Sequence, residues 1–251
     1  MASGNPYMRN RCDFTQKALT GTLHASGYAT RGEVGLGQNW VRFNINTILA
    51  MNMKTFLHVG CGPKHKNQTT RDFNSADWQE LRLDIDPSVA PDIVGTMTDM
   101  SGVADASVDA VFSSHNIEHL YPHEVPVALA EFKRVLKPDG FVVITCPDLQ
   151  SVCALIAEDK LTEPAYTSPA GPIAPLDILY GHRPPMARGN LYMAHRCGFT
   201  QKVLTGTLQA SGFATVAAKR RGHPYYDLWA LGTASALPET ELRELAQAHF
   251  P

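Results

Sequence analysis

Two glycines at the end of a short apolar run are the first residues with a chemical meaning. The run TFLHVG closes on Gly60, Cys61 and Gly62, and a glycine lets the backbone approach a ligand closely. In an open α/β sheet, ligands bind at the carboxyl ends of the strands, near the point where the strand order reverses. A GxG pair alone is equally consistent with a tight turn that holds no ligand.

Acidic residues follow at the ends of the next two predicted strands. In LRLDIDP, Asp84 ends an apolar run, and Asp86 is the second candidate. A carboxylate at that position can accept hydrogen bonds from both hydroxyls of a ribose, although a turn or helix cap is the alternative role. In GTMTDMS, Asp99 lies in the loop after the third strand, where a nucleobase amino group would lie.

Two histidines follow the fourth predicted strand, in the sequence SSHNIEHL. Imidazole can act as a base near neutral pH, so His115 and His119 are the catalytic candidates. For His119, a structural role at the start of a helix is the alternative. We interpret Glu118 as an acid that stabilises a helix N-terminus rather than as a catalytic group.

A stretch rich in proline and glycine, from Asp159 to His195, interrupts the pattern. Such an excursion inside a compact domain is typical of a lid or binding loop, and a plain linker is the alternative. Neighbouring His182 and Arg183 would suit an anionic substrate. With Tyr192 and His195 they form the predicted substrate-binding set, unless they are only a solvated patch.

The elements that must position these residues alternate between strands and helices, which predicts an open α/β sheet. An amphipathic helix is predicted in PVALAEFKRVLK, and FVVITC reads as a strand that is buried on both faces. A further helix is predicted in NWVRFNINTILAMN, residues 39–52, with Val41, Ile45, Ile48 and Leu49 on one face.

Four motifs in this order resemble those of a known family. LHVGCGP, LDIDP, TDMSGVADASVDAVFSSHNIEHL and EFKRVLKPDGFVVITCPDL together resemble class I S-adenosylmethionine-dependent methyltransferases of the small-molecule type, over about residues 55–149. The resemblance implies a Rossmann-like, open and mostly parallel seven-stranded sheet. It also implies helices on both faces and one antiparallel strand near the C-terminus.

The same resemblance implies roles for the matching positions. The cofactor S-adenosyl-L-methionine would contact Gly60, Cys61, Gly62, Lys64, Asp84, Ile85, Asp99, Met100, Ser114 and His115. Within this set the glycine loop would hold the methionine part, Asp84 the ribose, and Asp99 with Met100 the adenine. Two residues depart from the family pattern: His58 replaces an acidic residue, and Lys64 replaces a third glycine. The Lys64 side chain would either crowd the methionine carboxylate or bind it.

We therefore expect an enzyme of the EC 2.1.1 type that methylates a small-molecule acceptor. Because of the two departures, an inactive protein that senses S-adenosylmethionine or S-adenosylhomocysteine is the alternative. A nicotinamide-dependent oxidoreductase is disfavoured because GCGPKH is not GxGxxG. The sequence does not identify the acceptor or its nucleophilic atom.

Composition excludes several other classes. The chain has 251 residues and a net charge of −2, which gives no reason to expect a nucleic acid or a membrane as partner. Its five cysteines include no CxxC pair, so we expect no metal site. Their odd number suggests reduced thiols and a cytoplasmic location. No secretory signal and no membrane-spanning run is recognised.

One segment occurs twice. Residues Gly4–Thr30 align with Gly189–Thr215, with 20 of 27 positions identical. The C-terminal copy predicts a helix that starts at Thr200 and stops at Gly212. We expect an N-terminal extension, 1–54, and a methyltransferase domain, 55–251, with its lid at 159–195. The N-terminal copy would form an appended helix, and a homodimer that exchanges the two copies is the bolder hypothesis.

Overall fold

The computed structural model describes residues 31–36, 39–44 and 53–251. The chain divides into two compact units, 1–51 and 52–251. In the first unit, β1 (Arg31–Leu36) and β2 (Asn39–Asn44) pair as an antiparallel hairpin. The helix predicted over 39–52 is therefore wrong in its first six residues, because the aromatic and β-branched residues of NWVRFN favour a strand. Its remaining residues, and the N-terminal copy of the repeat, lie outside the described residues.

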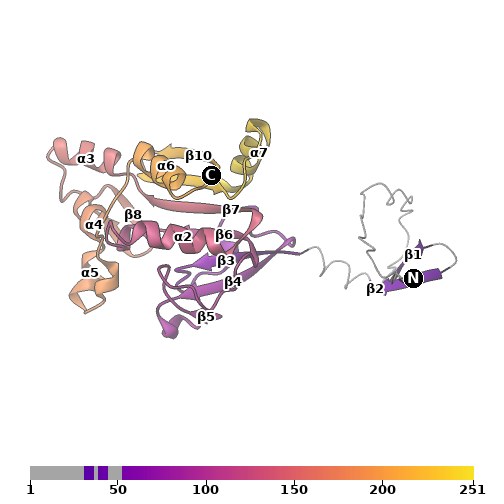
Figure 1. Cartoon of the computed structure of the whole chain (residues 1–251). Helices are drawn as coiled ribbons and strands as arrows, with labels where there is room; N and C mark the ends of the chain where they lie inside the picture. The colour runs from indigo at the N-terminus through magenta and orange to yellow at the C-terminus, as the bar shows by residue number, and fades with distance from the viewer. Residues whose placement is uncertain (1–30, 37–38, 45–52) are drawn as a thin grey trace, which may run out of the picture. The chain divides into compact units, whose positions relative to one another are not determined.

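The second unit is built on one twisted sheet of seven strands (Figure 1). The strands are β3 (Lys54–Val59), β4 (Trp78–Asp84), β5 (Ile93–Val94), β6 (Val108–Ser114), β7 (Leu136–Pro147), β10 (Thr215–Arg221) and β11 (Asp227–Thr233). Their order is β10-β11-β7-β6-β3-β4-β5, and β11 alone runs antiparallel to the other six strands. The predicted fold class is confirmed. The order reverses between β3 and β6, so the ends of these two strands mark the switch point of the sheet.

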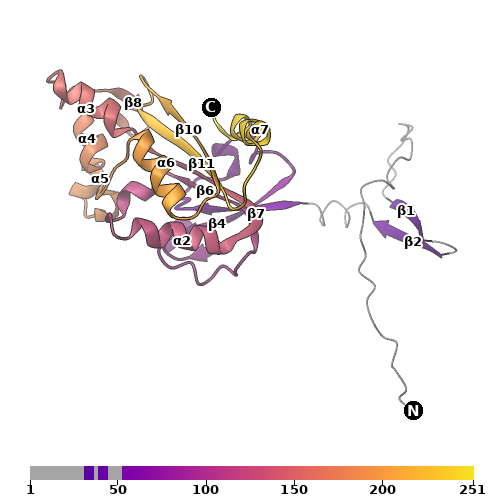
Figure 2. The ribbon, with the colours of Figure 1, turned by 45° about the horizontal axis from the view of Figure 1, so that its top comes forward.

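Both faces of the sheet are covered by helices (Figures 1 and 2). On one face α2 (Val125–Val135) and α6 (Gln201–Ala210) supply buried residues to the larger apolar core. On the other face α7 (Glu239–His249) packs beside an aromatic cluster of Phe56, Phe73, Trp78, Phe112 and Phe141. The FVVITC part of β7 reads as a continuous apolar run because neither of its faces meets water.

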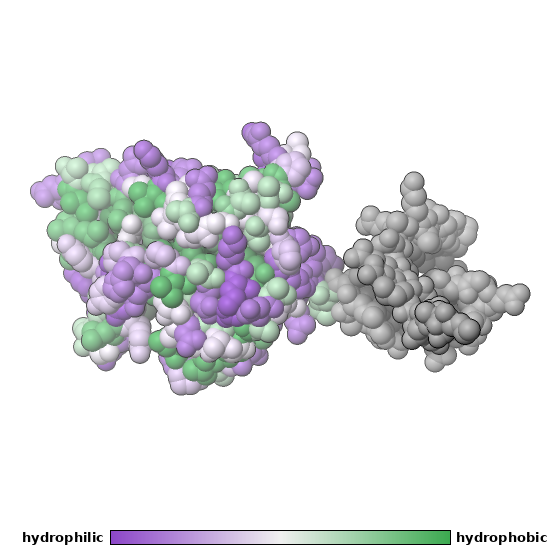
Figure 3. Space-filling model, viewed as in Figure 1, coloured by the Kyte–Doolittle hydropathy of each residue, from purple (hydrophilic) through white to green (hydrophobic). Residues whose placement is uncertain are grey.

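The predicted lid contains short regular elements. They are the hairpin of β8 (Tyr166–Ser168) and β9 (Gly171–Ile173), the helices α4 (Pro175–Tyr180) and α5 (Arg183–Ala187), and the 3-10 helix η5 (Leu191–Met193). A third apolar cluster attaches the segment to α3 (Leu149–Ala157) through Val152, Ile173, Ile178 and Tyr226. Hydrophobic residues gather over α3 and α4 on the face shown in Figure 3. The lid therefore has a small core of its own.

The C-terminal copy of the repeat forms the predicted helix. The Thr200 side chain accepts a hydrogen bond from the backbone N–H of Val203, and α6 ends shortly before Gly212, whose φ is 85°. Gly198, shortly before α6, packs closely against α3. A Cβ atom there would lie 2.4 Å from Cδ1 of Leu149, so close packing against α3 requires the glycine.

Candidate active site

A cavity of about 840 Å³ opens at the switch point of the sheet. Its wall combines the loops that follow β3, β4, β5 and β6 with the end of the lid segment. Residues from the β3 and β6 loops meet here because these strands are neighbours and run parallel. This is the position at which open α/β sheets bind their ligands.

Asn116 fixes the glycine loop. Its Nδ2 donates to the carbonyl oxygens of Val59, at 3.0 Å, and Ser114, at 3.1 Å. The backbone of Gly60 is left-handed, with a φ of 62°, and a Cβ atom there would lie 2.3 Å from Oδ1 of Asn116. Only glycine fits this position. The sequence prediction did not include Asn116, although it directly follows the predicted site residues Ser114 and His115.

The Asp84 carboxylate lies on the cavity wall at the end of β4. Its Oδ2 accepts from the backbone N–H of Gly62, at 2.7 Å, and its Oδ1 accepts from that of Asp86, at 2.9 Å. These bonds fix the carboxylate but leave each oxygen a further lone pair for a ligand hydroxyl. Asp86 is used differently, since its side chain caps the 3-10 helix η3 (Pro87–Val89).

Arg82 is a second residue that the sequence reading did not single out. Its buried guanidinium lies beneath the glycine loop. It donates to the carbonyl oxygens of Gly62, at 2.6 Å, and Ala90, at 2.9 Å. The guanidinium therefore ties the loop after β3 to the loop after β4, and both loops supply the cavity wall.

The predicted cofactor residues divide into two groups. Five of them line the cavity: Gly60, Gly62, Asp84, Ile85 and His115. Five do not: Cys61, Lys64, Asp99, Met100 and Ser114. From the loop after β5, Met97 and Thr98 take the wall positions in place of the two residues that follow them.

Four of the five residues outside the wall are buried or engaged elsewhere. Cys61 and Met100 are buried at 1% exposure. The Ser114 hydroxyl shares a hydrogen bond of 2.8 Å with that of Thr145. Asp99 is exposed and accepts from the N–H of Ser101, at 3.1 Å. Its carboxylate therefore holds its own turn instead of facing the cavity.

The two departures from the family pattern also lie away from the cavity wall. His58 is buried among aromatic rings, and its Nδ1 lies 2.7 Å from Oε1 of Glu80. Burial lowers the pKa of His58 despite this partner. Lys64 is exposed and is absent from the cavity wall. Neither residue therefore alters the surface that a cofactor would contact.

The catalytic candidates lie around the 3-10 helix η4 (Ile117–His119). His115 and His119 both line the cavity. His115 has a left-handed backbone with a φ of 54°, a conformation in which histidine is enriched among non-glycine residues. Its Nδ1 lies 3.3 Å from Oε1 of Glu118. Both catalytic candidates therefore lie on the cavity wall, and their catalytic role stays a prediction.

Glu118 lies in the first turn of η4, as expected of an acid at a helix N-terminus, but its carboxylate is buried. It is only 1% exposed, and neither carboxylate oxygen has a hydrogen-bond partner. Burial alone would raise the pKa of Glu118. The contact with His115, and then the charges of His119 and His195, lower its pKa below the ordinary value. Glu118 is thus a buried carboxylate surrounded by three histidines.

Of the four lid residues predicted to bind substrate, Tyr192 and His195 lie at or beside the cavity, and His182 and Arg183 do not line it. Tyr192 lines the cavity, and His195 places its ring centroid 4.9 Å from that of His119. Arg183 instead pairs with Asp177 in the lid, with its Nε 2.6 Å from Oδ1, and neighbouring His182 does not line the cavity. Burial lowers the pKa of His195.

Arg196 is a further residue that the sequence reading did not include. It lines the cavity, and its guanidinium carbon lies 4.8 Å from the centre of the Tyr121 ring. The cation therefore rests on an aromatic face at the rim of the cavity.

The comparisons agree with this architecture. Residues 57–144 match the family model described as a methyltransferase domain. The chain carries a class I S-adenosylmethionine-dependent methyltransferase domain. S-adenosylmethionine is the cofactor of this class. Within the methyltransferase domain, the matched residues contain the glycine loop, Asp84 and the two catalytic candidates.

Several solved structures are similar to the methyltransferase domain. One is the 1,6-didemethyltoxoflavin-N1-methyltransferase of Burkholderia thailandensis, solved with 1,6-didemethyltoxoflavin and S-adenosylhomocysteine. It is 14% identical, with 76% of each chain covered and a TM-score of 0.48. Another is an S-adenosylmethionine-dependent methyltransferase of Archaeoglobus fulgidus, 13% identical, covering 75% of this chain and 93% of that one with a TM-score of 0.49. No curated protein matches the chain.

Proposed function

We propose that this protein transfers the methyl group of S-adenosylmethionine to a small-molecule acceptor bound between the switch-point loops and the lid. The observation that carries the proposal is the Asp84 carboxylate. It lies at the end of β4 beside the glycine loop, on the wall of a cavity within a methyltransferase domain. A carboxylate in this place is suited to the two ribose hydroxyls of a nucleoside.

The cavity fits such a cofactor. A Cβ atom at Gly62 would meet no atom within 4 Å, so the loop leaves open space where the methionine part would lie. Met97 and Thr98 supply an apolar and a polar contact for the adenine. The volume of about 840 Å³ lies near the upper end of the range of about 300–1,000 Å³ for small-ligand sites. It therefore favours a cofactor together with a small acceptor.

The bound sulfonium supplies a reactive methyl group, so the protein must align the acceptor and accept a proton where the nucleophile carries one. His115 is the candidate base, because its ring is 47% exposed at the cavity and contacts the Glu118 carboxylate behind it. Tyr192 and Arg196 are placed to contact the acceptor from the lid side.

Release of S-adenosylhomocysteine tests this proposal. The purified chain is incubated with S-adenosylmethionine and panels of phenols, amines, thiols and carboxylic acids. We expect release with one acceptor class, and strongly reduced release with His115→Ala. His123→Ala is the matched control, because His123 is an exposed histidine outside the cavity wall. Binding of S-adenosylhomocysteine without turnover of any acceptor would favour a sensor.

Three further sequence predictions remain part of this proposal. We propose a boundary between the N-terminal extension and the methyltransferase domain at 54/55, and a lid at 159–195. A homodimer formed through residues 4–30 is expected from the repeat, and a cytoplasmic location is expected from the odd number of cysteines. In the described part of the chain, no helix combines the length and the apolar character needed to cross a bilayer.

A further inference from the structure

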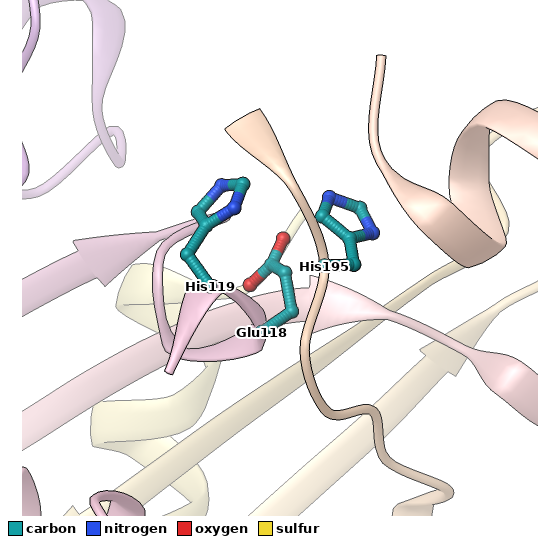
Figure 4. Close-up of side chains that lie close together, drawn as sticks. All are labelled: Glu118, His119 and His195. Atoms are coloured by element: carbon teal, nitrogen blue, oxygen red, sulfur yellow. The ribbon is translucent and has the colours of Figure 1, made fainter. Parts of the chain in front are cut away.

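Three potential metal ligands converge beside the cavity. They are Glu118 and His119 of η4 and His195 of the lid segment. Each offers one ligand atom, and these atoms all lie within 4.8 Å of one another. Figure 4 shows the Glu118 carboxylate between the two imidazole rings. We call these three residues the Glu–His–His cluster.

The backbone holds both histidines in the form that a metal ion requires. Nδ1 of His119 lies 3.1 Å from the carbonyl oxygen of Ala194, and Nδ1 of His195 lies 2.7 Å from that of Ile178. A carbonyl only accepts, so Nδ1 carries the proton in each ring, and in the neutral form of the ring Nε2 keeps its lone pair. Histidine ligands of metal ions usually donate their second ring N–H in this way.

Glu118 gives an independent reason to expect a cation. Its carboxylate is 1% exposed, and both oxygens lack a hydrogen-bond partner, since the His115 contact at 3.3 Å does not have hydrogen-bond geometry. A buried carboxylate without partners is costly. The backbone N–H groups of Arg196 and Cys197 donate to the backbone carbonyl oxygen of Glu118, at 2.8 and 3.2 Å. These bonds hold the residues that directly follow the lid against η4.

We propose that the Glu–His–His cluster binds one divalent transition-metal ion of the Zn²⁺ type. Two imidazoles and one carboxylate form the donor set of catalytic zinc sites, which keep a fourth position open. Magnesium and calcium prefer oxygen ligands and are disfavoured. Ligand distances of about 2.1 Å would place the ligand atoms roughly 3.4 Å apart, so the three side chains must close slightly on the ion.

His119 also lines the cavity, so a molecule in the cavity would have access to the fourth coordination position of the ion. A hydroxyl, thiol or carboxylate of the acceptor would be held at that position. This use of the ion rests on the proposed function, whereas metal binding itself does not. The sequence predicted no metal because it considered cysteine spacing. A ligand pair separated as widely as His119 and His195 becomes visible only in the fold.

Metal titration of the full chain tests the proposal. Zn²⁺ is titrated by calorimetry and Co²⁺ by visible absorption, with the wild type, His195→Asn and Glu118→Gln. We expect one Co²⁺ ion with tetrahedral absorption bands and no sulfur-to-metal charge-transfer band. Each variant should weaken binding by more than the roughly 10- to 100-fold typical of changes to an outer-shell partner. Glu118→Gln keeps the side-chain shape, so it covers the case in which His195→Asn does not fold.

The matched control is His65→Asn. His65 is 63% exposed and lies 3.7 Å from a carboxylate oxygen of Glu80, away from the cluster, so its loss should leave metal binding unchanged. If the wild type and both cluster variants bind Zn²⁺ and Co²⁺ with equal affinity, or if the wild type binds neither ion, the three side chains form an ion-paired cluster and not a metal site. Titration of S-adenosylhomocysteine into metal-free protein separates the two proposals, because cofactor binding does not need the ion.

Discussion

Replacing Gly60 by alanine should destabilise the domain more than the same change at Gly62. Both glycines have left-handed backbones, with φ values of 62° and 53°, and this conformation costs an ordinary residue about 1–2 kcal/mol. They differ in their surroundings. A Cβ atom at Gly60 would lie 2.3 Å from Oδ1 of Asn116, whereas one at Gly62 would meet nothing within 4 Å.

The additional cost at Gly60 comes from the displacement of Asn116. Its side chain must swing away from the new methyl group and lose the hydrogen bonds to the carbonyls of Val59 and Ser114, at 3.0 and 3.1 Å. Each such bond contributes about 1 kcal/mol. Gly60→Ala should therefore lower the free energy of unfolding by about 3–4 kcal/mol, and Gly62→Ala by about 1–2 kcal/mol.

Urea unfolding followed by circular dichroism measures both values, and an Asn116→Ala background tests their cause. Without the Asn116 amide, Gly60→Ala should cost only the backbone strain, which gives a coupling energy of about 2 kcal/mol between the two positions. Equal costs for the two glycine variants, or strict additivity of Gly60→Ala and Asn116→Ala, would refute this reasoning.

Three other outcomes are expected. Burial lowers the pKa of His249 to about 4, so the unfolded chain takes up the proton first as pH falls below about 6.5. The free energy of unfolding of the wild type, relative to that of His249→Phe, should therefore fall by about 2 kcal/mol between pH 7 and pH 5. If the urea midpoints of the two proteins change equally between these pH values, the prediction is contradicted. Thr200→Ala should lower the free energy of unfolding by about 1 kcal/mol through loss of the α6 cap, while mid-helix Thr207→Ala should not. A chain that begins at Gly37 should elute as a monomer in size-exclusion chromatography with light scattering if the repeat exchanges between two molecules; an oligomeric state equal to that of the full chain would exclude the exchange.

The repeat also constrains that exchange. At the positions that align with Tyr192, Met193 and Arg196, the N-terminal copy keeps identical residues, but Asn10 stands where the C-terminal copy has His195. A copy supplied by a second chain would therefore reproduce much of the cavity wall and lack one ligand of the Glu–His–His cluster. Metal content and oligomeric state should consequently vary together if the exchange occurs.

Features set by local pattern were predictable from the sequence. Apolar runs such as FVVITC identified the buried strands, because a strand covered on both faces leaves no polar alternation. The same logic placed Asp84 at a strand end, and the cap at Thr200 marked the start of α6. Each of these depends on a few neighbouring residues.

Features that depend on contacts distant in sequence were not predictable. Asn116 is important because it meets Gly60 across the switch point, and Gly198 because it meets Leu149. Glu118 reads locally as a helix acid, but the fold buries it at 1% exposure beside His195, which is distant in sequence. The strand at 39–44 was mistaken for a helix because a short apolar pattern fits both periods.

Titration calorimetry of the wild type, Asp84→Ala and Asp86→Ala with S-adenosylhomocysteine tests whether the switch-point cavity binds the cofactor through Asp84. We expect saturable one-to-one binding to the wild type. Asp84→Ala should weaken binding roughly 10- to 100-fold through loss of about 1.5–3 kcal/mol of charge-assisted hydrogen bonding, and Asp86→Ala much less. Urea unfolding of each variant establishes that the domain is folded. Absence of binding to the wild type at millimolar ligand would show that the cavity is not a cofactor site, and equal binding to folded Asp84→Ala would show that Asp84 does not hold the ribose.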